Sequence, residues 1–236
     1  MLVERGLAES RVKAQRLILT GTVRVDGQVA DKPGRPCAAD AILEVIAGDK
    51  FVSRGGGKLE AAFEAFHLDV NVKVCVDIGA STGGFTDCLL QHGASRVYAV
   101  DVGKGQLDWR LRNDPRVVVK EELNARYLSE RDIPEPFQFA VIDVSFISLT
   151  LILPPVTKLL GSGGEIVSLI KPQFEAGREN VGKGGVVRDP SVHAAVVAQI
   201  RQFGTTVLSM EWLGSCESPL RGPAGNIEFL AWWRKI

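Results

Sequence analysis

Residues 77–85, DIGASTGGF, give the strongest local indication of the fold. A run of mostly apolar residues at 72–79 predicts a buried strand that leads into it, and residues 85–92 are predicted to form a helix that follows it. A glycine-rich turn between a buried strand and a helix is the context in which cofactors of the nucleotide type bind. The stretch therefore predicts a cofactor site in an α/β domain.

The sequence on either side of this stretch alternates between strand and helix patterns. An amphipathic helix is predicted at residues 59–66, and further strands at 96–101, 116–119, 139–143 and 165–171. A helix at 190–203 and two closing strands at 206–213 and 227–233 complete the pattern. Repeated strand–helix units predict a parallel sheet with helices on both faces.

Two kinds of cofactor fit the glycine-rich turn. Asp101 comes 22 residues after Gly79 at the end of the next predicted strand, where a carboxylate binds a ribose. The turn lacks the G-x-G-x-x-G spacing of a dinucleotide site, and Asp77 suits the ammonium of S-adenosylmethionine better than a phosphate. A dinucleotide, or a plain turn with no ligand, remains an alternative. The candidate cofactor residues are Asp77, Gly79, Ser81, Thr82, Gly83, Gly84, Asp101, Glu122 and Asn124.

Four charged residues stand where a second cluster is expected. Asp143 and Lys171 close two of the predicted strands, Lys58 precedes the first helix of this region, and Glu228 lies on the last strand. The carboxyl ends of parallel strands line one edge of the sheet, so Asp143 and Lys171 should share that edge. One such residue alone would be an ordinary surface charge, whereas four at these places indicate a functional set.

The N-terminal residues predict a separate small domain. Apolar spacing predicts a first helix over residues 2–9, and Ser10 and Gly21 have the right types to begin and end a second one. Residues 23–29 alternate around Asp-Gly and predict a hairpin, with a third strand at 41–46. Residues 1–24 carry five basic side chains against two acidic ones. Such a patch attracts polyanions, although it is also typical of a solvated helix face.

Composition limits the possible classes of protein. The chain has 236 residues, no net charge and 45% hydrophobic residues, which is typical of a globular protein. Its four cysteines form no C-x-x-C pair, and the three histidines show no ligand spacing, so no metal site is expected. No stretch has the length of a membrane span and no signal peptide is evident, so we expect a cytoplasmic protein.

Longer motifs resemble known families. Residues 2–34 resemble the S4 RNA-binding domain through S-R-x-x-A-x-x-L-I and G-x-V-x-V-D-G. Lys58, Asp143, Lys171 and Glu228 match the K-D-K-E set of FtsJ-like ribose 2'-O-methyltransferases. Together with S-R-G-G-G-K-L, D-V-S-F-I-S-L, I-K-P-Q-F-E-A-G-R and G-K-G-G-V-V-R-D-P, these motifs resemble the TlyA (hemolysin A) family over essentially the whole chain.

The resemblance implies a fold and a division into domains. It implies a Rossmann-like class I methyltransferase sheet with helices on both faces, and a small α+β RNA-binding domain before it. The implied bounds are 1–49 for the RNA-binding domain, whose N-terminal edge looks incomplete, 50–57 for a linker and 58–236 for the catalytic domain.

The resemblance also implies an activity. Members methylate the ribose 2'-hydroxyl of cytidines in ribosomal RNA with S-adenosylmethionine, so ribosomal RNA or ribosomal subunits are the expected partners. Lys58, Asp143, Lys171 and Glu228 become the expected catalytic residues, with Lys171 either a base or a group that positions the hydroxyl. Arg11, Lys13, Arg16 and Arg24 become the expected RNA contacts. A non-catalytic RNA-binding or ribosome-assembly protein and a cytolysin remain the alternatives.

Overall fold

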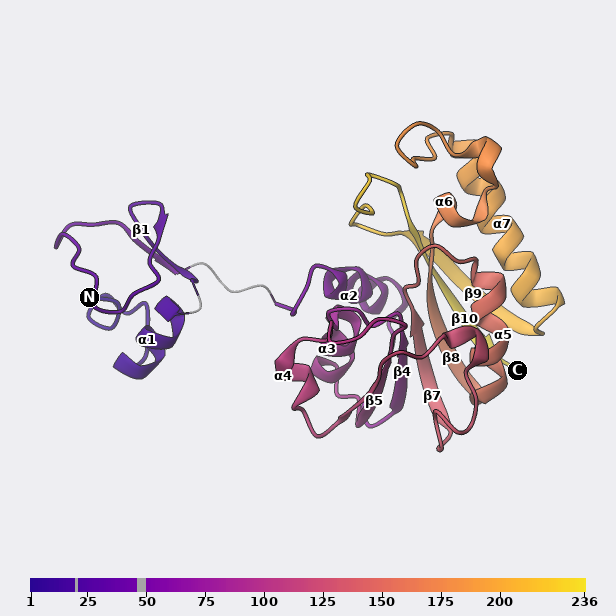
Figure 1. Ribbon diagram of the computed structural model, residues 1–236, viewed down its shortest axis with the longest axis horizontal. Coiled ribbons are helices and arrows are strands. Elements are labelled where there is room, and N and C mark those ends of the chain that lie inside the picture. The colour runs from indigo at the N-terminus through magenta and orange to yellow at the C-terminus, as the bar shows by residue number, and fades with distance from the viewer. Residues whose placement is uncertain (20, 46–49) are drawn as a thin grey trace. The chain divides into compact units, whose positions relative to one another are not determined.

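The computed structural model describes residues 1–19, 21–45 and 50–236, and the chain divides into two compact units (Figure 1). The first unit is Met1–Lys50 and the second is Phe51–Ile236. Each unit contains its own cluster of buried apolar side chains. The units are therefore built, and are described, separately.

The first unit packs one helix against a three-stranded antiparallel sheet. It contains α1 (Arg11–Leu19), β1 (Val23–Val25), β2 (Gln28–Val29) and β3 (Leu43–Val45), with strand order β2-β1-β3. The Ser10 hydroxyl accepts a hydrogen bond from the backbone N–H of Lys13 at 3.2 Å, so Ser10 caps α1 as expected. Asp26 and Gly27 have φ values of 50° and 78°, the left-handed conformation that a tight hairpin turn needs.

One helix expected in the first unit is absent from the described residues. Residues 2–9 form turns rather than a helix, so that prediction was wrong. The N–H of Arg5 donates a hydrogen bond to the carbonyl of Met1, which forms a single helical turn. The chain then leaves the helical conformation at Gly6, whose φ is +71°. So short a segment cannot propagate a helix against its nucleation cost. Ile46, the expected end of the third strand, lies outside the described residues.

The second unit is a seven-stranded sheet in the order β6-β5-β4-β7-β8-β10-β9. Its strands are β4 (Val74–Ile78), β5 (Arg96–Val100), β6 (Val117–Lys120), β7 (Phe137–Ile142), β8 (Leu160–Ile170), β9 (Met210–Glu217) and β10 (Phe229–Lys235). The first five of these pair in parallel, as the alternating pattern predicted. The two closing strands, for which no direction was predicted, differ: β10 runs antiparallel between β8 and β9, so the sheet is mixed.

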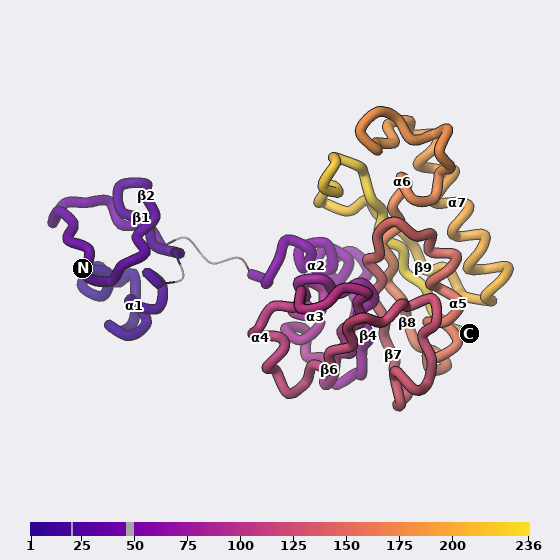
Figure 2. Tube along the Cα trace, in the orientation of Figure 1, coloured from indigo at the N-terminus to yellow at the C-terminus, as the bar shows by residue number. Residues whose placement is uncertain are grey.

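Helices cover both faces of this sheet (Figure 2). The helices are α2 (Gly55–Phe66), α3 (Gly84–Gln91), α4 (Trp109–Arg112), α5 (Leu149–Leu159), α6 (Pro172–Glu175) and α7 (Pro190–Thr206), with short 3-10 turns at Ala125–Tyr127 and Arg178–Asn180. Neighbouring strand residues serve opposite faces. Cys75 packs with the cluster that contains Leu59 and Leu89, and Val76 packs with the cluster that contains Ile152 and Ile200. The predicted Rossmann-like architecture is confirmed.

Several element boundaries differ from the sequence predictions. α7 continues to Thr206 and β9 begins at Met210, so the strand expected at 206–213 begins later. α5 was not among the predicted helices, and Pro154 and Pro155 lie inside it. Residues 55–57 were assigned to a linker, whereas they form the first turn of α2. Gly56 packs directly against the ring of Phe51, where a Cβ would collide with the ring. This glycine therefore serves close packing. Within the described residues, no helix has the length and apolarity to cross a membrane.

Candidate active site

Two ion pairs lie in one cavity of the second unit, one of them buried and the other, whose Asp143 side chain is 20% exposed, partly buried. Lys58 Nζ lies 2.6 Å from Glu228 Oε2, and Lys171 Nζ lies 2.6 Å from Asp143 Oδ1. The side chains of Lys58, Lys171 and Glu228 are 9%, 9% and 1% exposed. All four predicted residues line a cavity of about 310 Å³. The structure therefore brings the K-D-K-E set together, with two cations facing two carboxylates.

Four different elements supply these side chains. Lys58 lies in the first turn of α2, Asp143 directly follows β7 and Lys171 directly follows β8. Glu228 directly precedes β10, whose first residue Phe229 pairs with Ile170 at the end of β8. Because β10 runs antiparallel to β8, the start of β10 lies beside the end of β8. This pairing carries Glu228 to the same edge as the two residues at the ends of parallel strands.

The glycine-rich turn forms one wall of this cavity. Gly79, Ala80, Ser81, Thr82 and Gly84 line it. Gly79 has a φ of +88°, and a Cβ on it would lie 2.5 Å from the backbone carbonyl oxygen of Asp143. A glycine is therefore required for the loops after β4 and β7 to pack together. Gly83, with a φ of +95°, caps α3 and does not line the cavity.

Asp101 ties the turn to the next strand. Its Oδ2 accepts the N–H of Ser81 at 2.8 Å and its Oδ1 accepts the N–H of Gly103 at 2.7 Å. The residue directly follows β5 and is half-buried. Each carboxylate oxygen has a second lone pair, so Asp101 retains the capacity to accept hydrogen bonds from the hydroxyls of a ligand.

Asp77 lies beneath the turn rather than on the cavity wall. It is fully buried, and its Oδ2 accepts the hydroxyl of Thr86 at 2.7 Å. Burial raises the pKa of Asp77 to about 7, with Asp143 and Asp101 raising it further and Thr86 opposing them. Its Oδ1 has no hydrogen-bond partner among the described residues. The geometry thus gives Asp77 a supporting place under the loop, which differs from the predicted contact with an ammonium.

Glu122 and Asn124 do not line the cavity. Glu122 is exposed and pairs with Lys104 at 2.9 Å. The Asn124 side chain accepts the N–H of Arg126 at 3.1 Å and so caps a 3-10 turn. Their segment is nevertheless joined to the loop after β5, since the N–H of Glu122 donates to Gly103 and the N–H of Leu123 donates to Asp101.

Three residues around the cavity were missed in the sequence. Ser145 lines the cavity, and its Oγ accepts a hydrogen bond from Lys171 at 3.0 Å. Arg54 also lines it and is exposed. Phe146, next to Ser145, is 91% exposed with a φ of +63°. All three lie inside motifs quoted above, S-R-G-G-G-K-L and D-V-S-F-I-S-L, so the signal was present but was not resolved to single residues.

A fourth missed residue, Glu175, joins the two loops that carry Asp143 and Lys171. Glu175 follows Lys171 in α6, and its carboxylate accepts the Ser148 hydroxyl at 2.6 Å and the N–H of Leu149 at 2.8 Å. Burial raises the pKa of Glu175, and these two hydrogen bonds oppose the shift. The contacts fix the start of α5 to α6, which holds together the two loops that carry Asp143 and Lys171.

The four expected RNA contacts lie on the first unit. Arg11, Lys13 and Arg16 are exposed on α1, and Arg24 is exposed on β1. Lys13 also pairs with Glu9 at 2.9 Å, an exposed pair that contributes little to stability. The structure thus keeps these cations at the surface of one small unit.

Comparisons with known proteins agree with this geometry. A family model described as FtsJ-like methyltransferase matches residues 51–235, and one described as S4 domain matches residues 1–43. The 16S/23S rRNA (cytidine-2'-O)-methyltransferase TlyA of Mycobacterium tuberculosis is 47% identical over 99% of this chain and 87% of its own length. YqxC of Bacillus subtilis, provisionally named an rRNA methyltransferase, is 52% identical over 98% of this chain and 82% of its own length.

Solved structures are similar as well. A crystal structure from Lactococcus lactis, provisionally described as a hemolysin, is 51% identical, with a TM-score of 0.78 over 80% of this chain and 90% of its own. A crystal structure from Listeria monocytogenes, provisionally described as an S-adenosylmethionine-dependent methyltransferase, is 17% identical, with a TM-score of 0.55 over 78% of this chain and 100% of its own. The second likeness concerns the fold alone.

Proposed function

The chain belongs to the FtsJ-like methyltransferase family, and on this premise we propose that it transfers a methyl group from S-adenosylmethionine to the ribose 2'-hydroxyl of a cytidine in ribosomal RNA. The observation that carries the proposal is the enclosure of the pairs Lys58–Glu228 and Lys171–Asp143 in one cavity with the glycine-rich turn. The chain is accordingly an enzyme, and ribosomal RNA as substrate assigns it to the cytoplasm.

S-adenosylmethionine supplies an electrophilic methyl carbon when it is bound. Its fit rests on the cavity wall formed by residues 79–82 and 84 and on the carboxylate of Asp101 at the adjacent strand end. In this assignment Asp101 would accept hydrogen bonds from the ribose hydroxyls of the cofactor, and the turn would hold its methionine end. Glu122 and Asn124 lie outside the cavity lining, but their segment is hydrogen-bonded to the loop after β5, and through this connection they would border the adenine. Asp77 supports the turn from below.

Lys171 acts on the hydroxyl that receives the methyl group. Its ammonium forms an ion pair with Asp143 at 2.6 Å and donates a hydrogen bond to Ser145 at 3.0 Å, and an ammonium has three N–H groups, so a donor remains for the ribose oxygen. A donor fixed in this way would orient the hydroxyl and stabilise the negative charge that develops on its oxygen as the methyl group is transferred and the hydroxyl proton passes to water. We therefore assign Lys171 a positioning and electrostatic role rather than that of the base. Lys58 and Glu228 line the same cavity as a second ion pair.

The RNA side of the site also has candidate residues. Phe146 and Phe174 have ring centroids 5.1 Å apart, and Phe146 is almost fully exposed. An exposed aromatic ring beside a nucleotide site can stack on a base, and Arg54 at the cavity can contact a phosphate. The first unit, residues 1–49 in the domain division proposed above, holds structured RNA through Arg11, Lys13, Arg16 and Arg24.

The test is transfer of radiolabelled methyl groups to unmodified ribosomal subunits. Lys171→Ala should lower the rate by about 10²–10³, the range for loss of one fixed donor to a developing negative charge. Lys171→Arg keeps a permanent cation that cannot act as a base, and it should retain more activity than alanine if the role is electrostatic. Lys158→Ala, an exposed lysine at the end of α5, is the matched control.

Three results would count against the proposal. A 2'-O-methyl group protects the neighbouring phosphodiester from alkali. Label recovered in mononucleotides after alkaline hydrolysis would therefore place the methyl group elsewhere than on the 2'-oxygen. Equal labelling by wild type and Lys171→Ala would remove Lys171 from the reaction. Binding of S-adenosylmethionine without labelling of any subunit would favour a non-catalytic RNA-binding protein.

A further inference from the structure

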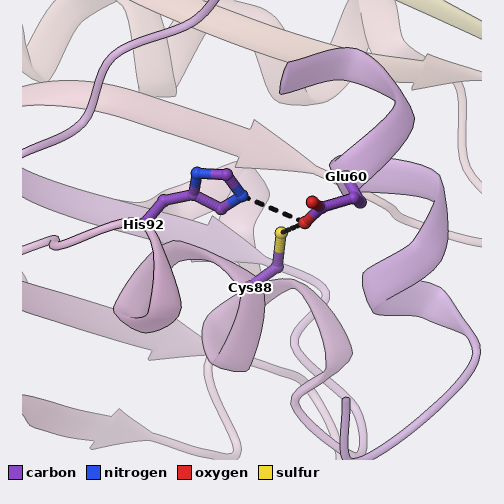
Figure 3. A group of neighbouring side chains, drawn as sticks. All are labelled: Glu60, Cys88 and His92. Carbon is purple, nitrogen blue, oxygen red and sulfur yellow. Dashed lines mark hydrogen bonds and ion pairs between the residues drawn. The ribbon is translucent and has the colours of Figure 1, made fainter. Parts of the chain in front are cut away.

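Three side chains with metal-ligating atoms converge between α2 and α3, away from the proposed active site (Figure 3). Glu60 comes from α2, Cys88 from α3, and His92 is the residue that ends α3. Glu60 Oε2 lies 3.0 Å from His92 Nε2 and 3.7 Å from Cys88 Sγ, and all three ligand atoms lie within 4.8 Å of one another. One carboxylate oxygen therefore faces both a ring nitrogen and a sulfur.

The packing of the two helices holds this arrangement in place. Cys88 and His92 are four residues apart and so share one face of α3. The His92 ring stacks on Phe63 of α2, with centroids 3.8 Å apart and planes 5° apart. In this orientation its Nε2 points toward Glu60 (Figure 3). Cys88 is fully buried, whereas the side chains of Glu60 and His92 are 20% and 32% exposed. The cluster thus has a fixed inner ligand and an outer side through which an ion can enter.

We propose that Glu60, Cys88 and His92 bind a zinc ion that joins α2 to α3. Zinc bonds of about 2.0–2.3 Å in tetrahedral geometry place ligand N and O atoms about 3.4 Å apart and ligand S and O atoms about 3.6 Å apart. The observed 3.0 Å and 3.7 Å differ from these by a few tenths of an ångström. Water takes the fourth position on the exposed side.

The chemistry of the donor set selects zinc. Magnesium and calcium take oxygen ligands, whereas a thiolate, an imidazole and a carboxylate together suit zinc. A thiolate at Cys88 and a carboxylate at Glu60 carry two negative charges, which a divalent cation neutralises. The Cys88 thiol and the Glu60 carboxylate already lie 3.7 Å apart, so replacing the thiol proton with the ion requires little movement.

The position gives the ion a structural role. Glu60 lies two residues after Lys58 on α2, and α3 begins at Gly84 of the glycine-rich turn. An ion between the helices would therefore hold the helix that carries Lys58 against the helix that follows the cofactor turn. The ion would join the two helices near the C-terminal end of α3, whereas the N-terminal end of α3 lies at the cavity.

The test measures metal binding by the full chain, with no readout of methyl transfer. The chain is stripped with a chelator, loaded with Zn²⁺ and desalted, and its zinc content is measured. A second sample takes Co²⁺, whose absorption spectrum reports a thiolate ligand. We expect one ion per chain, a thiolate-to-cobalt band, and a Tm raised by about 5–10 °C at a free Zn²⁺ concentration 100 times the Kd.

Variants identify the ligands. His92→Asn and Cys88→Ser should each weaken binding beyond the about 10–100-fold that loss of a supporting residue costs, and Cys88→Ser should abolish the thiolate band. His67→Asn and Cys37→Ser are matched controls, because both residues are exposed and His67 ends α2 as His92 ends α3. His92 is partly exposed, so His92→Asn decides the question even if Cys88→Ser fails to fold. Zinc binding that is unchanged in His92→Asn, or no stable ion in the wild type, would overturn the proposal.

Discussion

Replacing Glu228 with glutamine should destabilise the second unit by leaving a buried cation alone. Glu228 is 1% exposed and Lys58 is 9% exposed, and their charged atoms lie 2.6 Å apart. Glu228→Gln preserves the shape of the side chain but removes the charge that compensates Lys58. The ammonium would then remain in a site from which water is largely excluded.

The magnitude follows from this burial. Removing one partner of a buried ion pair costs about 3–5 kcal/mol, because the other charge remains desolvated without compensation. One kcal/mol shifts the Tm of a domain of about 150–250 residues by about 2–4 °C. Glu228→Gln should therefore lower the Tm by roughly 6–20 °C. Adding Lys58→Met removes the stranded charge, so the double variant should recover most of that loss.

The assay is a double-mutant cycle. Thermal and urea unfolding give the free energy of unfolding of the wild type, of Glu228→Gln, of Lys58→Met and of the double variant, each as the full chain. A coupling energy of at least about 2 kcal/mol between the two positions is expected for a contacting buried pair. A Tm of Glu228→Gln within 2 °C of wild type, on the order of the shift for one kcal/mol, would refute the argument. So would a double variant whose loss equals the sum of the two single losses, because the two charges would then act independently.

Further predictions concern the cofactor turn and the RNA-binding unit. Burial raises the pKa of Asp77 to about 7 in the folded chain, so the stability this group contributes at low pH is lost as pH rises toward and through 7. Urea unfolding should show wild type losing roughly 3 kcal/mol more than Asp77→Asn between pH 5 and 8, and parallel pH profiles would contradict this. Gly79→Ala places a Cβ against the carbonyl of Asp143 at a φ of +88°, so it should cost about 1–3 kcal/mol and weaken S-adenosylmethionine binding in calorimetry; unchanged affinity would remove the turn from the site. Arg11→Ala and Arg24→Ala should each weaken RNA binding and reduce its slope against log salt by about 1, whereas an unchanged slope would show that the residue contacts no phosphate.

Local patterns predicted much of the fold because the elements concerned depend on nearby residues. Ser10 caps α1 through its own neighbour at Lys13, and the Asp26-Gly27 turn needs only two residues with positive φ. The apolar runs before Gly79 and Asp143 form parallel strands at the centre of the sheet. Local preference failed at two places: residues 2–9 do not form a helix, and α5 forms in spite of two prolines because its apolar face is buried.

The proposed active site was predicted only in part, for a related reason. Asp143 and Lys171 were placed together because both directly follow parallel strands. The meeting of Glu228 with Lys58 depends on the antiparallel insertion of β10 beside β8, which no local pattern indicates. The resemblance to a family named the four residues, but the 2.6 Å pairs and the supporting Ser145 and Glu175 appear only in the folded chain.

Three features could be predicted from sequence alone: the strand–helix sheet, the position of the glycine-rich turn and the exposed basic side chains of the first unit. Strand–helix alternation and turn chemistry are encoded by residues close in the chain. The tertiary structure decided the rest. The two ion pairs join residues 28 and 170 positions apart, and the cluster of Glu60, Cys88 and His92 requires α2 and α3 to pack. The i,i+4 spacing of Cys88 and His92 was visible in the sequence, but their third ligand lies on another helix. Contacts between distant segments depend on how whole faces are buried, and that is settled only when the chain folds.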